Sequence, residues 1–437
     1  MHVDTLIHAR WLITMEQDDV LEHHALAISQ GRIKAIIPSQ QAREEIEADN
    51  VVEMNDHALM PGLINAHTHS PMTLFRGIAD DLPLMDWLNN HIWPAEARWV
   101  REDFVADGAR LAIAEMIRGG TTCFNDMYFY PDITAQVADQ LGMRAVVGLI
   151  VVDFPSSWAE GPDDYINKGL KLHDEYRQNA LIHTAFAPHA PYSVSDDPLS
   201  KVHTYSNELD IPVHIHVHET ADEVNLGLEN HDMRPISRLF ELGLINPNLV
   251  AVHMTQLNDD EIQLFAKQKA NVVHCPESNL KLAAGFCPTA KLLEAGVNVA
   301  LGTDGAASNN DLDMLGELRT AALLGKGVAG DASAIPAMQA LRMATINGAR
   351  ALGISDETGS LAVGKSADLC AINLKTPETA PVYNPVSHIV YAANRDQVTD
   401  VWIRGNRLLK DRNLTRIDET TLCENSHSWG ERIRNGS

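Results

Sequence analysis

The stretch Leu59-Met60-Pro61-Gly62-Leu63-Ile64-Asn65-Ala66-His67-Thr68-His69 ends an apolar run with two histidines. Side chains at positions i and i+2 of a strand point to the same side, so His67 and His69 can share one metal ion. A lone His-x-His pair is weak evidence in a chain with 20 histidines. Three further polar segments, however, also lie at the ends of apolar, strand-like runs. These segments are His214-Ile215-His216-Val217-His218-Glu219, Val252-His253 and Gly302-Thr303-Asp304-Gly305.

Short apolar runs alternate with segments of helical periodicity along the middle of the chain. In one helical segment the apolar side chains between residues 105 and 116 share a face, and Gly119-Gly120 then stops the helix. Eight strands alternating with helices predict a (β/α)8 barrel of the α/β class. An open, doubly wound sheet is the alternative, but polar segments follow the carboxyl ends of strands across the series, as in barrels. The predicted strands are residues 63–66, 121–125, 144–151, 181–187, 213–217, 249–252, 271–274 and 297–302.

Both ends of the chain differ from the middle, because they show short strands and turns without crossover helices. We therefore expect a small β-sandwich-like domain built from residues 1–60 and 360–437, with the catalytic barrel, residues 61–359, inserted between them. The polar sequence from about residue 418 predicts a loosely packed helix or a tail. The predicted terminal strands are residues 5–7, 10–14, 24–28, 33–37, 51–54, 361–363, 368–372, 398–404 and 407–410.

The composition excludes several classes of protein. The 437 residues are 45% hydrophobic, which is ample for a core. The formal net charge of -25 repels phosphate backbones and anionic lipids, so we expect neither a nucleic-acid nor a membrane partner. We find no signal-peptide pattern and no uncharged apolar stretch long enough to span a bilayer. Five scattered cysteines without a Cys-x-x-Cys pair favour a cytoplasmic protein without disulfides.

The polar segments suit a metal-dependent hydrolase. In a closed barrel the carboxyl ends of all strands meet at one mouth. Two or three imidazoles with one carboxylate suit zinc and leave a position open for water, whose pKa the metal lowers to ~7. Asp304 can then take a proton from the water, and Glu219 can deliver it to the substrate. The residues predicted at the mouth are His67, His69, His216, His253 and Asp304.

Longer runs resemble the amidohydrolase superfamily over nearly the whole chain, and most of all its methylthioadenosine/S-adenosylhomocysteine deaminases and their triazine-hydrolase relatives. The resemblance begins with Pro61-Gly62-Leu63-Ile64-Asn65-Ala66-His67-Thr68-His69. The closer markers are His69-Ser70-Pro71-Met72-Thr73-Leu74-Phe75-Arg76-Gly77, Trp93-Pro94-Ala95-Glu96 and Ala187-Pro188-His189-Ala190-Pro191-Tyr192-Ser193. Matching runs also include His274-Cys275-Pro276-Glu277-Ser278-Asn279, Ala344-Thr345-Ile346-Asn347-Gly348-Ala349 and the segment from Gly359 to Leu369.

The resemblance implies a role for each site residue. One divalent metal, usually zinc, would be bound by His67, His69, His216 and Asp304. Glu219 would move protons to and from the purine ring, and His253 would orient or polarise the attacking water. Glu96 would bind the ribose hydroxyls, and His189 would contact the nucleoside. Relatives with two metals use a carboxylated lysine on strand 4, and residues 180–192 hold no lysine, so a single metal is favoured.

Each assignment has a structural alternative. Chemistry alone does not choose among His214, His216 and His218, because they alternate on one strand face. Only the match to His-x-x-Glu selects His216. Asp304 could instead cap a helix, and His274 is more simply read as a core histidine.

Two substrate contacts also have structural alternatives. Glu96 follows a Pro, so it could be a first-turn carboxylate stabilised by the helix dipole. His189 could be a rigid loop residue. For both, the family match favours the functional reading.

The predicted reaction is zinc-dependent hydrolytic deamination of an adenine nucleoside, with a small-molecule substrate and a homo-oligomeric enzyme. Deamination of guanine, deamination or dechlorination of triazines, and a non-catalytic scaffold on the same fold are the alternatives. The loop at residues 153–164 contains four acidic residues, Phe154 and Trp158, and no Lys or Arg. A carboxylate needs a cationic partner, so we expect 5′-methylthioadenosine as the best substrate, with S-adenosylhomocysteine and adenosine weaker. Should the loop fold away from the mouth, Arg76 could serve the carboxylate instead.

Overall fold

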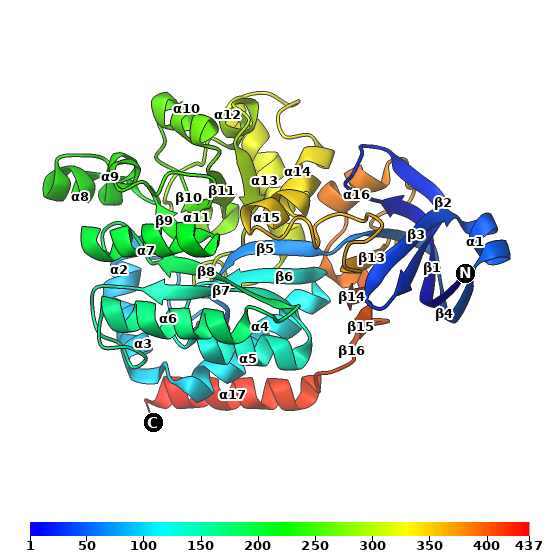
Figure 1. Cartoon of the computed structure of the whole chain (residues 1–437), viewed down its shortest axis with the longest axis horizontal. Helices are drawn as coiled ribbons and strands as arrows, with labels where there is room; N and C mark the ends of the chain where they lie inside the picture. The colour runs from blue at the N-terminus through cyan, green and yellow to red at the C-terminus, as the bar shows by residue number, and fades with distance from the viewer. Residues whose placement is uncertain (437) are drawn as a thin grey trace.

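Eight parallel strands form a barrel in the computed structural model, which describes residues 1–436 (Figure 1). Neighbours in the barrel are also neighbours in the sequence. Three of the predicted strands match the observed bounds at both ends, and the other five differ by one or two residues. The barrel strands are β5 (Leu63–Thr68), β6 (Thr121–Asp126), β7 (Arg144–Val151), β8 (Ile182–Pro188), β9 (Val213–Val217), β10 (Leu249–His253), β11 (Asn271–His274) and β12 (Asn298–Leu301).

The residues that follow β12 meet the first strand and bring the two ends of the series together. The backbone N–H of Asp304 donates to the carbonyl of His67 at 3.0 Å. The amide of Asn65 accepts from the Thr303 backbone N–H at 3.0 Å and donates to the Thr303 hydroxyl at 2.7 Å. Since the first and last strands meet, the (β/α)8 prediction is confirmed and the open, doubly wound sheet is excluded.

Helices between the strands cover the outside of the barrel (Figure 1). The predicted helix after β5 is α4 (Glu102–Arg118), whose apolar face is buried and which ends before Gly120, where φ is +90°. Between β5 and α4 lie η1 (Ser70–Phe75), α2 (Leu84–Trp87), η2 (Leu88–Ile92) and α3 (Trp93–Trp99). The later helices are α5 (Pro131–Leu141), α6 (Pro162–Tyr176), α7 (Asp196–Leu209), α8 (Ala221–His231), α9 (Pro235–Glu241), α10 (Asp259–Gln268), α11 (Pro276–Lys281), α12 (Thr289–Glu294), α13 (Met314–Ala329), α14 (Ala337–Met343) and α15 (Ile346–Ala351).

Strands from both ends of the chain form one continuous eight-stranded sheet, in the order β16-β15-β14-β13-β4-β1-β2-β3. These strands were expected to form a sandwich-like domain; their hydrogen bonds join them in a single sheet. The N-terminal elements are β1 (His2–Ile13), β2 (Val20–Ser29), β3 (Arg32–Pro38), α1 (Ser39–Glu45) and β4 (Glu47–Pro61). The C-terminal elements are β13 (Leu369–Asn373), α16 (Pro385–Tyr391), η3 (Arg395–Gln397), β14 (Val398–Ile403), β15 (Asn406–Lys410), β16 (Asn413–Leu414) and α17 (Glu419–Asn435).

Two predictions for the terminal segments were wrong in detail. Residues 361–363 form no strand, because they lie between Gly359 and Gly364, both at positive φ, in a turn-rich connection. The two strands predicted at residues 5–7 and 10–14 are one strand, β1, whose pairing with β4 shifts register between Ala9 and Trp11. A local irregularity of this kind bends a strand without ending it.

The sheet joins the barrel at the amino ends of the barrel strands. Gly62, which precedes β5, donates its backbone N–H to the carbonyl of Asp368 at 3.1 Å. Arg144, the first residue of β7, donates its Nε–H to the Asp368 carboxylate at 2.7 Å, and both side chains are fully buried. The sheet therefore leaves the carboxyl ends of the strands free. The division into domains at residues 60/61 and 359/360 stays a prediction.

The C-terminal helix α17 packs on the barrel helix α4, although the predicted boundary assigns it to the composite domain. Trp429 is buried, its ring meets that of Phe104 edge-on at 5.3 Å, and its Nε1–H donates to Asp107 at 2.9 Å. The polar sequence from residue 418 is therefore a helix held by one aromatic anchor.

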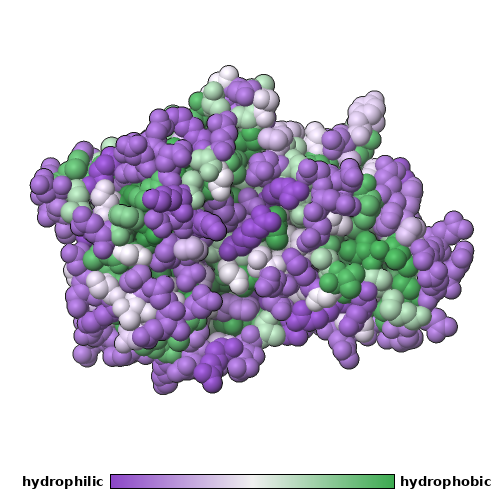
Figure 2. All heavy atoms as spheres, turned by 45° about the horizontal axis from the view of Figure 1, so that its top comes forward, coloured by the Kyte–Doolittle hydropathy of each residue, from purple (hydrophilic) through white to green (hydrophobic). Residues whose placement is uncertain are grey.

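Hydrophilic side chains cover most of the face shown in Figure 2, with an apolar area at the end of the molecule that holds the terminal sheet. This surface agrees with the strongly acidic composition. Within residues 1–436, no helix combines the length and the apolar character needed to cross a bilayer.

Candidate metal centre and substrate cavity

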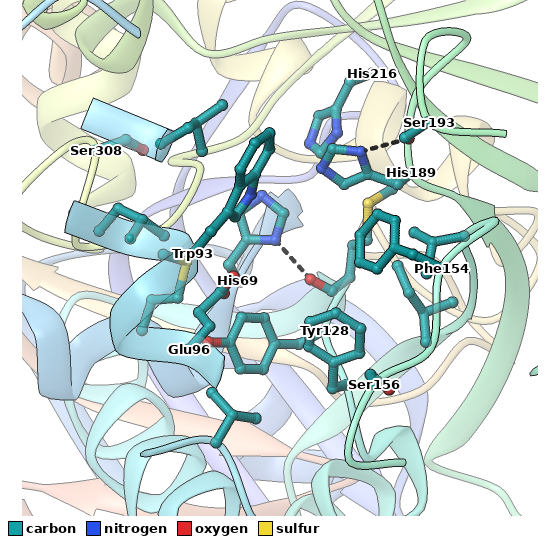
Figure 3. Close-up of a pocket in the computed structure, with 18 of the residues that line it drawn as sticks. His69, Trp93, Glu96, Tyr128, Phe154, Ser156, His189, Ser193, His216 and Ser308 are labelled. Atoms are coloured by element: carbon teal, nitrogen blue, oxygen red, sulfur yellow. Dashed lines mark hydrogen bonds between the residues drawn. The ribbon is translucent and has the colours of Figure 1, made fainter. Parts of the chain in front are cut away.

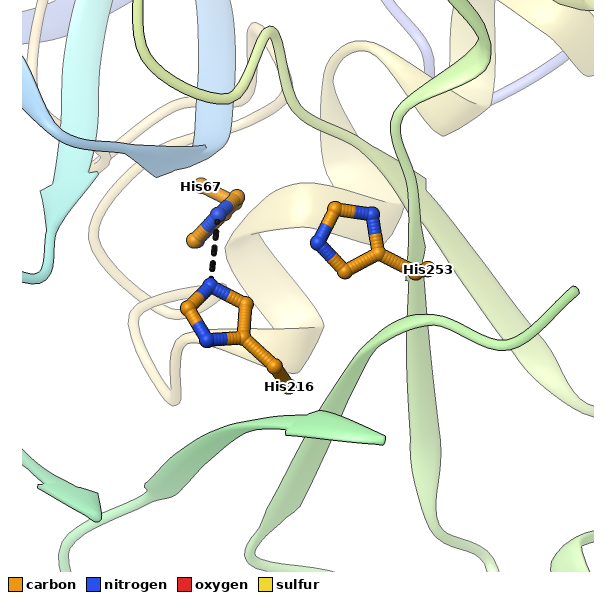
Figure 4. Close-up of side chains that lie close together, drawn as sticks. All are labelled: His67, His216 and His253. Atoms are coloured by element: carbon orange, nitrogen blue, oxygen red, sulfur yellow. Dashed lines mark hydrogen bonds between the residues drawn. The ribbon is translucent and has the colours of Figure 1, made fainter. Parts of the chain in front are cut away.

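Nitrogen and oxygen atoms from four strand ends, those of β5, β9, β10 and β12, converge at the mouth of the barrel. Nε2 of His67 lies 3.2 Å from Oδ1 of Asp304, and Nε2 of His69 lies 3.2 Å from the same oxygen. Nε2 of His216 lies 3.2 Å from Nε2 of His67 (Figure 4). His253 belongs to the same group, since one nitrogen each from His67, His216 and His253 lie within 4.8 Å of one another. The structure thus brings together every residue predicted at the mouth.

The spacing of these atoms fits a zinc site. Ligand atoms held ~2.0–2.2 Å from a tetrahedral zinc ion stand roughly 3.3–3.6 Å apart, close to the separations observed. Nδ1–H of His69 donates to the Met127 carbonyl at 2.5 Å, which leaves the lone pair on Nε2, the nitrogen that faces Asp304. A backbone carbonyl behind a histidine is a common way to orient a metal ligand. The donor set therefore suits a divalent ion.

The three alternating histidines of the β9 segment have separate environments. His216 faces the cluster and lines the cavity. His214 lies behind His67, with its Nε2 2.9 Å from Nδ1 of His67. His218 follows the strand with φ of +52°, and its Nε2 accepts from the backbone N–H of Ile236 at 3.4 Å in α9. Of the three, His216 alone lies near Nε2 of His67 and lines the cavity, whereas His214 contacts the opposite ring nitrogen of His67.

Asp304 uses its two carboxylate oxygens differently. Oδ1 faces His67 and His69 and accepts from the Gly305 backbone N–H at 2.8 Å. Oδ2 accepts from the hydroxyls of Ser278 at 2.6 Å and Ser308 at 2.8 Å. Burial raises the pKa of this carboxyl, but the two histidines outweigh burial and hold the pKa well below its usual range. Asp304 is therefore a carboxylate held in place by contacts on both oxygens.

Glu219 lies beside the histidine cluster. Its Oε1 is 3.8 Å from Nε2 of His253, and burial raises the pKa of its carboxyl. Behind it, each carboxylate oxygen of Glu223 accepts one backbone N–H, from His218 at 2.9 Å and from Glu219 at 2.7 Å. A buried carboxyl whose pKa is raised holds its proton more readily than an exposed one, as a group that protonates a substrate must.

A cavity of about 830 Å³ opens over this cluster (Figure 3). Its lining includes His69, His216, His253, Glu219 and Asp304 from the cluster. The segment from α2 to α3 and the loop after β7 form the walls above them. Within the described residues, no lysine or arginine lines this cavity.

The two predicted nucleoside contacts, Glu96 and His189, both line the cavity. Glu96 comes from α3 and lies beside Tyr128 (Figure 3). Burial raises the pKa of its carboxyl to about 7, although Tyr128 and His69 oppose the rise. Nδ1 of His189 lies 2.8 Å from the Ser193 hydroxyl, and burial lowers the pKa of this imidazole to about 3. His189 therefore faces the cavity as a neutral ring.

The loop after β7 lies at the mouth and does not fold away from it. Asp153, Phe154, Pro155, Ser156 and Ser157 all line the cavity. The remaining acidic residues of the predicted loop do not, since α6 already begins at Pro162. Trp158 also points elsewhere and packs on Tyr165, with their ring centroids 5.7 Å apart. The wall is therefore less acidic than the sequence suggests.

Sequence reasoning missed four polar residues that support the site: Ser278, Asn279, Ser308 and Glu223. The first two lie in the run His274-Cys275-Pro276-Glu277-Ser278-Asn279. This run matched the family in the sequence, but the match assigned no role to Ser278 or Asn279. His274 itself is buried and does not line the cavity, in keeping with its reading as a core histidine.

A model of the amidohydrolase family matches residues 58–408, which include the whole barrel and every residue of the cluster. The chain belongs to the amidohydrolase family. It is 48% identical over 432 residues to the 5-methylthioadenosine/S-adenosylhomocysteine deaminase of Teredinibacter turnerae, covering 99% of this chain and 98% of that protein. It is also 45% identical over 380 residues to the 5′-deoxyadenosine deaminase of Methanothermobacter thermautotrophicus, with 86% and 88% covered.

A solved structure supports the same relationship. The crystal structure of an adenosine deaminase from Xanthomonas campestris with bound zinc aligns with a TM-score of 0.98 at 53% identity, covering 99% of both chains. The resemblance to amidohydrolases of the deaminase type is therefore confirmed.

Proposed function

We propose that this amidohydrolase is a zinc-dependent deaminase of adenine nucleosides. The observation that carries the proposal is the convergence of His67, His69, His216 and Asp304 beneath a cavity that also contains Glu219 and Glu96. Two similar proteins and one similar structure bear the names of adenine-nucleoside deaminases, which supports the same reaction.

We propose that the zinc ion would be held by His67, His69, His216 and Asp304. When bound, the metal supplies a water of low pKa, close to ~7, for hydrolysis at neutral pH. The donor atoms of this set already stand at separations suited to one tetrahedral ion, and residues 180–192 offer no lysine for a second.

The carboxyl groups of Asp304 and Glu219 would transfer the protons of the reaction. Water adds to C6 of the adenine ring while Asp304 accepts its proton and Glu219 protonates the adjacent ring nitrogen. The C6–N bond then breaks: the amine takes the proton held by Asp304 and leaves as ammonia, while the C6 hydroxyl returns a proton to Glu219 as the C6 carbonyl of the inosine analogue forms. His253, 3.8 Å from Glu219, would orient the water between these two carboxyl groups.

Glu96 and His189 would select the nucleoside. An ionised Glu96 can accept both ribose hydroxyls, and the neutral His189 can contact the purine. Deamination of guanine or of a triazine is less well supported, because a free base or a triazine would leave the half-buried Glu96 without a ribose to bind. A non-catalytic scaffold would need none of the predicted ligands, and all four are present.

The substrate question is tested by ammonia release from adenosine, 5′-methylthioadenosine, S-adenosylhomocysteine and guanine with the zinc-loaded protein. We expect deamination of the adenine nucleosides and little of guanine. Equal or greater activity on guanine, or no ammonia from any substrate at full zinc occupancy, would overturn the proposal.

Two expectations extend the proposal. A location in the cytoplasm is supported by the five free cysteines, of which four are buried. A homo-oligomer is proposed from the family resemblance, and light scattering of the purified protein tests it.

A further inference from the structure

The short helix α11, which follows β11, contacts the ends of both neighbouring strands. The Ser278 hydroxyl donates to Asp304, which follows β12, at 2.6 Å. On the other side, the amide oxygen of Asn279 lies 2.9 Å from Nδ1 of His253, the last residue of β10. β11 thus adds no predicted metal ligand of its own, but helix α11 behind it contacts one proposed site residue on each side.

The contact with Asn279 fixes the orientation of the His253 ring. An amide oxygen only accepts hydrogen bonds, so it requires the imidazole proton on Nδ1. Nε2 then carries the lone pair and faces Glu219 at 3.8 Å, on the side of the cavity. A side chain behind a histidine commonly sets its tautomer in this way.

Asn279 has no other polar contact for its side chain. It is 2% exposed, and its Nδ2 has no partner among the described residues. An asparagine retained only for packing would not need its single amide contact directed at His253. His253 also adopts a backbone φ of +74°, a conformation that non-glycine residues hold only when their surroundings impose it.

We propose that Asn279 is a positioning residue for deamination, which holds His253 with Nε2 turned toward Glu219 and the attacking water. This inference rests on the proposed function. Loss of a group that orients a site histidine typically costs 10–100-fold in activity. We expect a fall of that size in kcat, with KM nearly unchanged, because Asn279 does not line the cavity.

The test compares zinc-loaded Asn279→Leu, Asn279→Ala and Asn279→Asp with the unmodified enzyme. Both Leu and Ala remove the hydrogen-bond acceptor, but Leu keeps the volume of the side chain and Ala reduces it. If one of these variants fails to fold, the other can still be measured. Asp keeps an acceptor of the same shape and should recover most of the lost kcat. Asn271→Leu is the matched control, because Asn271 is a buried asparagine at the opposite end of β11. Its replacement should lower stability but leave kcat unchanged.

A double-mutant cycle with His253→Ala separates positioning from general packing. If Asn279 acts through His253, its replacement has almost no further effect on kcat in the His253→Ala background. An equal fall in both backgrounds, a kcat within about threefold of the unmodified enzyme, or no recovery by Asn279→Asp would each overturn the inference. Failure of the proposed function is distinguishable, because the unmodified enzyme would then release no ammonia.

Discussion

Two buried polar clusters lie at opposite ends of the same barrel. They differ in how many of their polar atoms find hydrogen-bond partners within the cluster. At the amino ends of the strands, Arg144 and Asp368 form a pair that is fully buried. At the carboxyl ends, His67, His69, His216 and Asp304 bring several lone pairs together with few protons to share.

The first cluster is complete. The two oxygens of Asp368 accept from Arg144, from the Ser366 hydroxyl at 2.7 Å and from the Arg404 backbone N–H at 2.8 Å. The remaining guanidinium nitrogens donate to the Ala180 carbonyl and to Ser366, both at 3.0 Å. A buried ion pair with every group satisfied serves structure and has no capacity left for a ligand.

The second cluster suits a cation. Its atoms lie at distances suited to ligands on one ion, and the backbone beside it holds left-handed conformations at His218, His253 and Asp304. Strain of this kind collects at functional sites and is maintained by the surrounding fold. The comparison teaches that the polar atoms of a structural cluster are hydrogen-bonded to one another. In the proposed functional cluster, by contrast, the lone pairs of several side chains face a common point where a cation could bind.

The largest expected effect is at Asp304. Asp304→Ala removes a proposed zinc ligand and the proposed base together, so activity should fall by roughly 10⁴-fold or more. Zinc content, measured by atomic absorption after dialysis, should fall as well. The matched change at the other cluster, Asp368→Ala, should leave zinc bound. Full zinc occupancy in Asp304→Ala would contradict its assignment as a ligand.

The next largest effect is expected at Glu219, where a substitution should lower kcat without removing the metal. Glu219→Gln keeps the shape of the side chain but cannot exchange a proton, so kcat should fall by about 10²–10⁴-fold. Zinc content and thermal stability should stay close to those of the unmodified protein. Near-normal turnover in this variant would remove Glu219 from the mechanism.

The sequence predicted the barrel because each buried parallel strand is an apolar run bounded by turns, and β7, β9 and β11 were predicted with their observed bounds. It failed at residues 361–363, where apolar residues lie between two glycines at positive φ. A short apolar run alone does not reveal such a backbone conformation.

The convergence of the proposed ligand residues was predictable because each lies at or next to the end of a strand, but their supporting contacts were not. Ser278 and Asn279 act on residues of two other strands, and a hydrogen bond between strand ends leaves no spacing pattern in the sequence. The choice among the β9 histidines likewise depended on the family match. The backbone at His218 is left-handed, which turns its side chain away from the cluster, and the sequence pattern does not reveal this conformation.

The third prediction concerns stability. Asp368→Ala leaves Arg144 buried without its partner and should lower the free energy of unfolding by about 3–5 kcal/mol. The control Asp164→Ala breaks a partly exposed pair with Lys168 and should lower the free energy of unfolding far less, because solvent screens the attraction in an exposed pair. Chemical denaturation measures both. Equal losses would show that the buried pair has no special structural role.

The same pair predicts a pH dependence. Burial raises the pKa of Asp368, but Arg144 outweighs burial and holds the pKa below its ordinary value. The stabilisation is therefore present above the unfolded pKa of about 3.9 and is lost as the pH falls through the lower folded value. Denaturation curves in acid should converge for the unmodified protein and Asp368→Ala; a constant difference down to the lowest pH would contradict this origin.

The smallest expected effect concerns substrate preference, because one of the two substrates carries a charged tail into the mouth of the cavity. Three cations on segments that adjoin the cavity walls are already paired: Arg76 with Glu115, Lys281 with Asp80, and Lys168 with Asp164. The carboxylate of S-adenosylhomocysteine would therefore meet Phe154 and Asp153 without a cationic partner. We expect 5′-methylthioadenosine to exceed it in kcat/KM by at least about tenfold, which corresponds to ~1.4 kcal/mol.

Competition between the two substrates measures this ratio directly. Phe154→Arg supplies the missing cation and should narrow the difference, whereas the matched Phe154→Leu should keep it. If the unmodified enzyme already treats both substrates equally, one of the paired cations must leave its partner and turn toward the tail. Arg76→Gln would then reveal whether Arg76 does so, because that variant alone would restore the preference for the methylthio group.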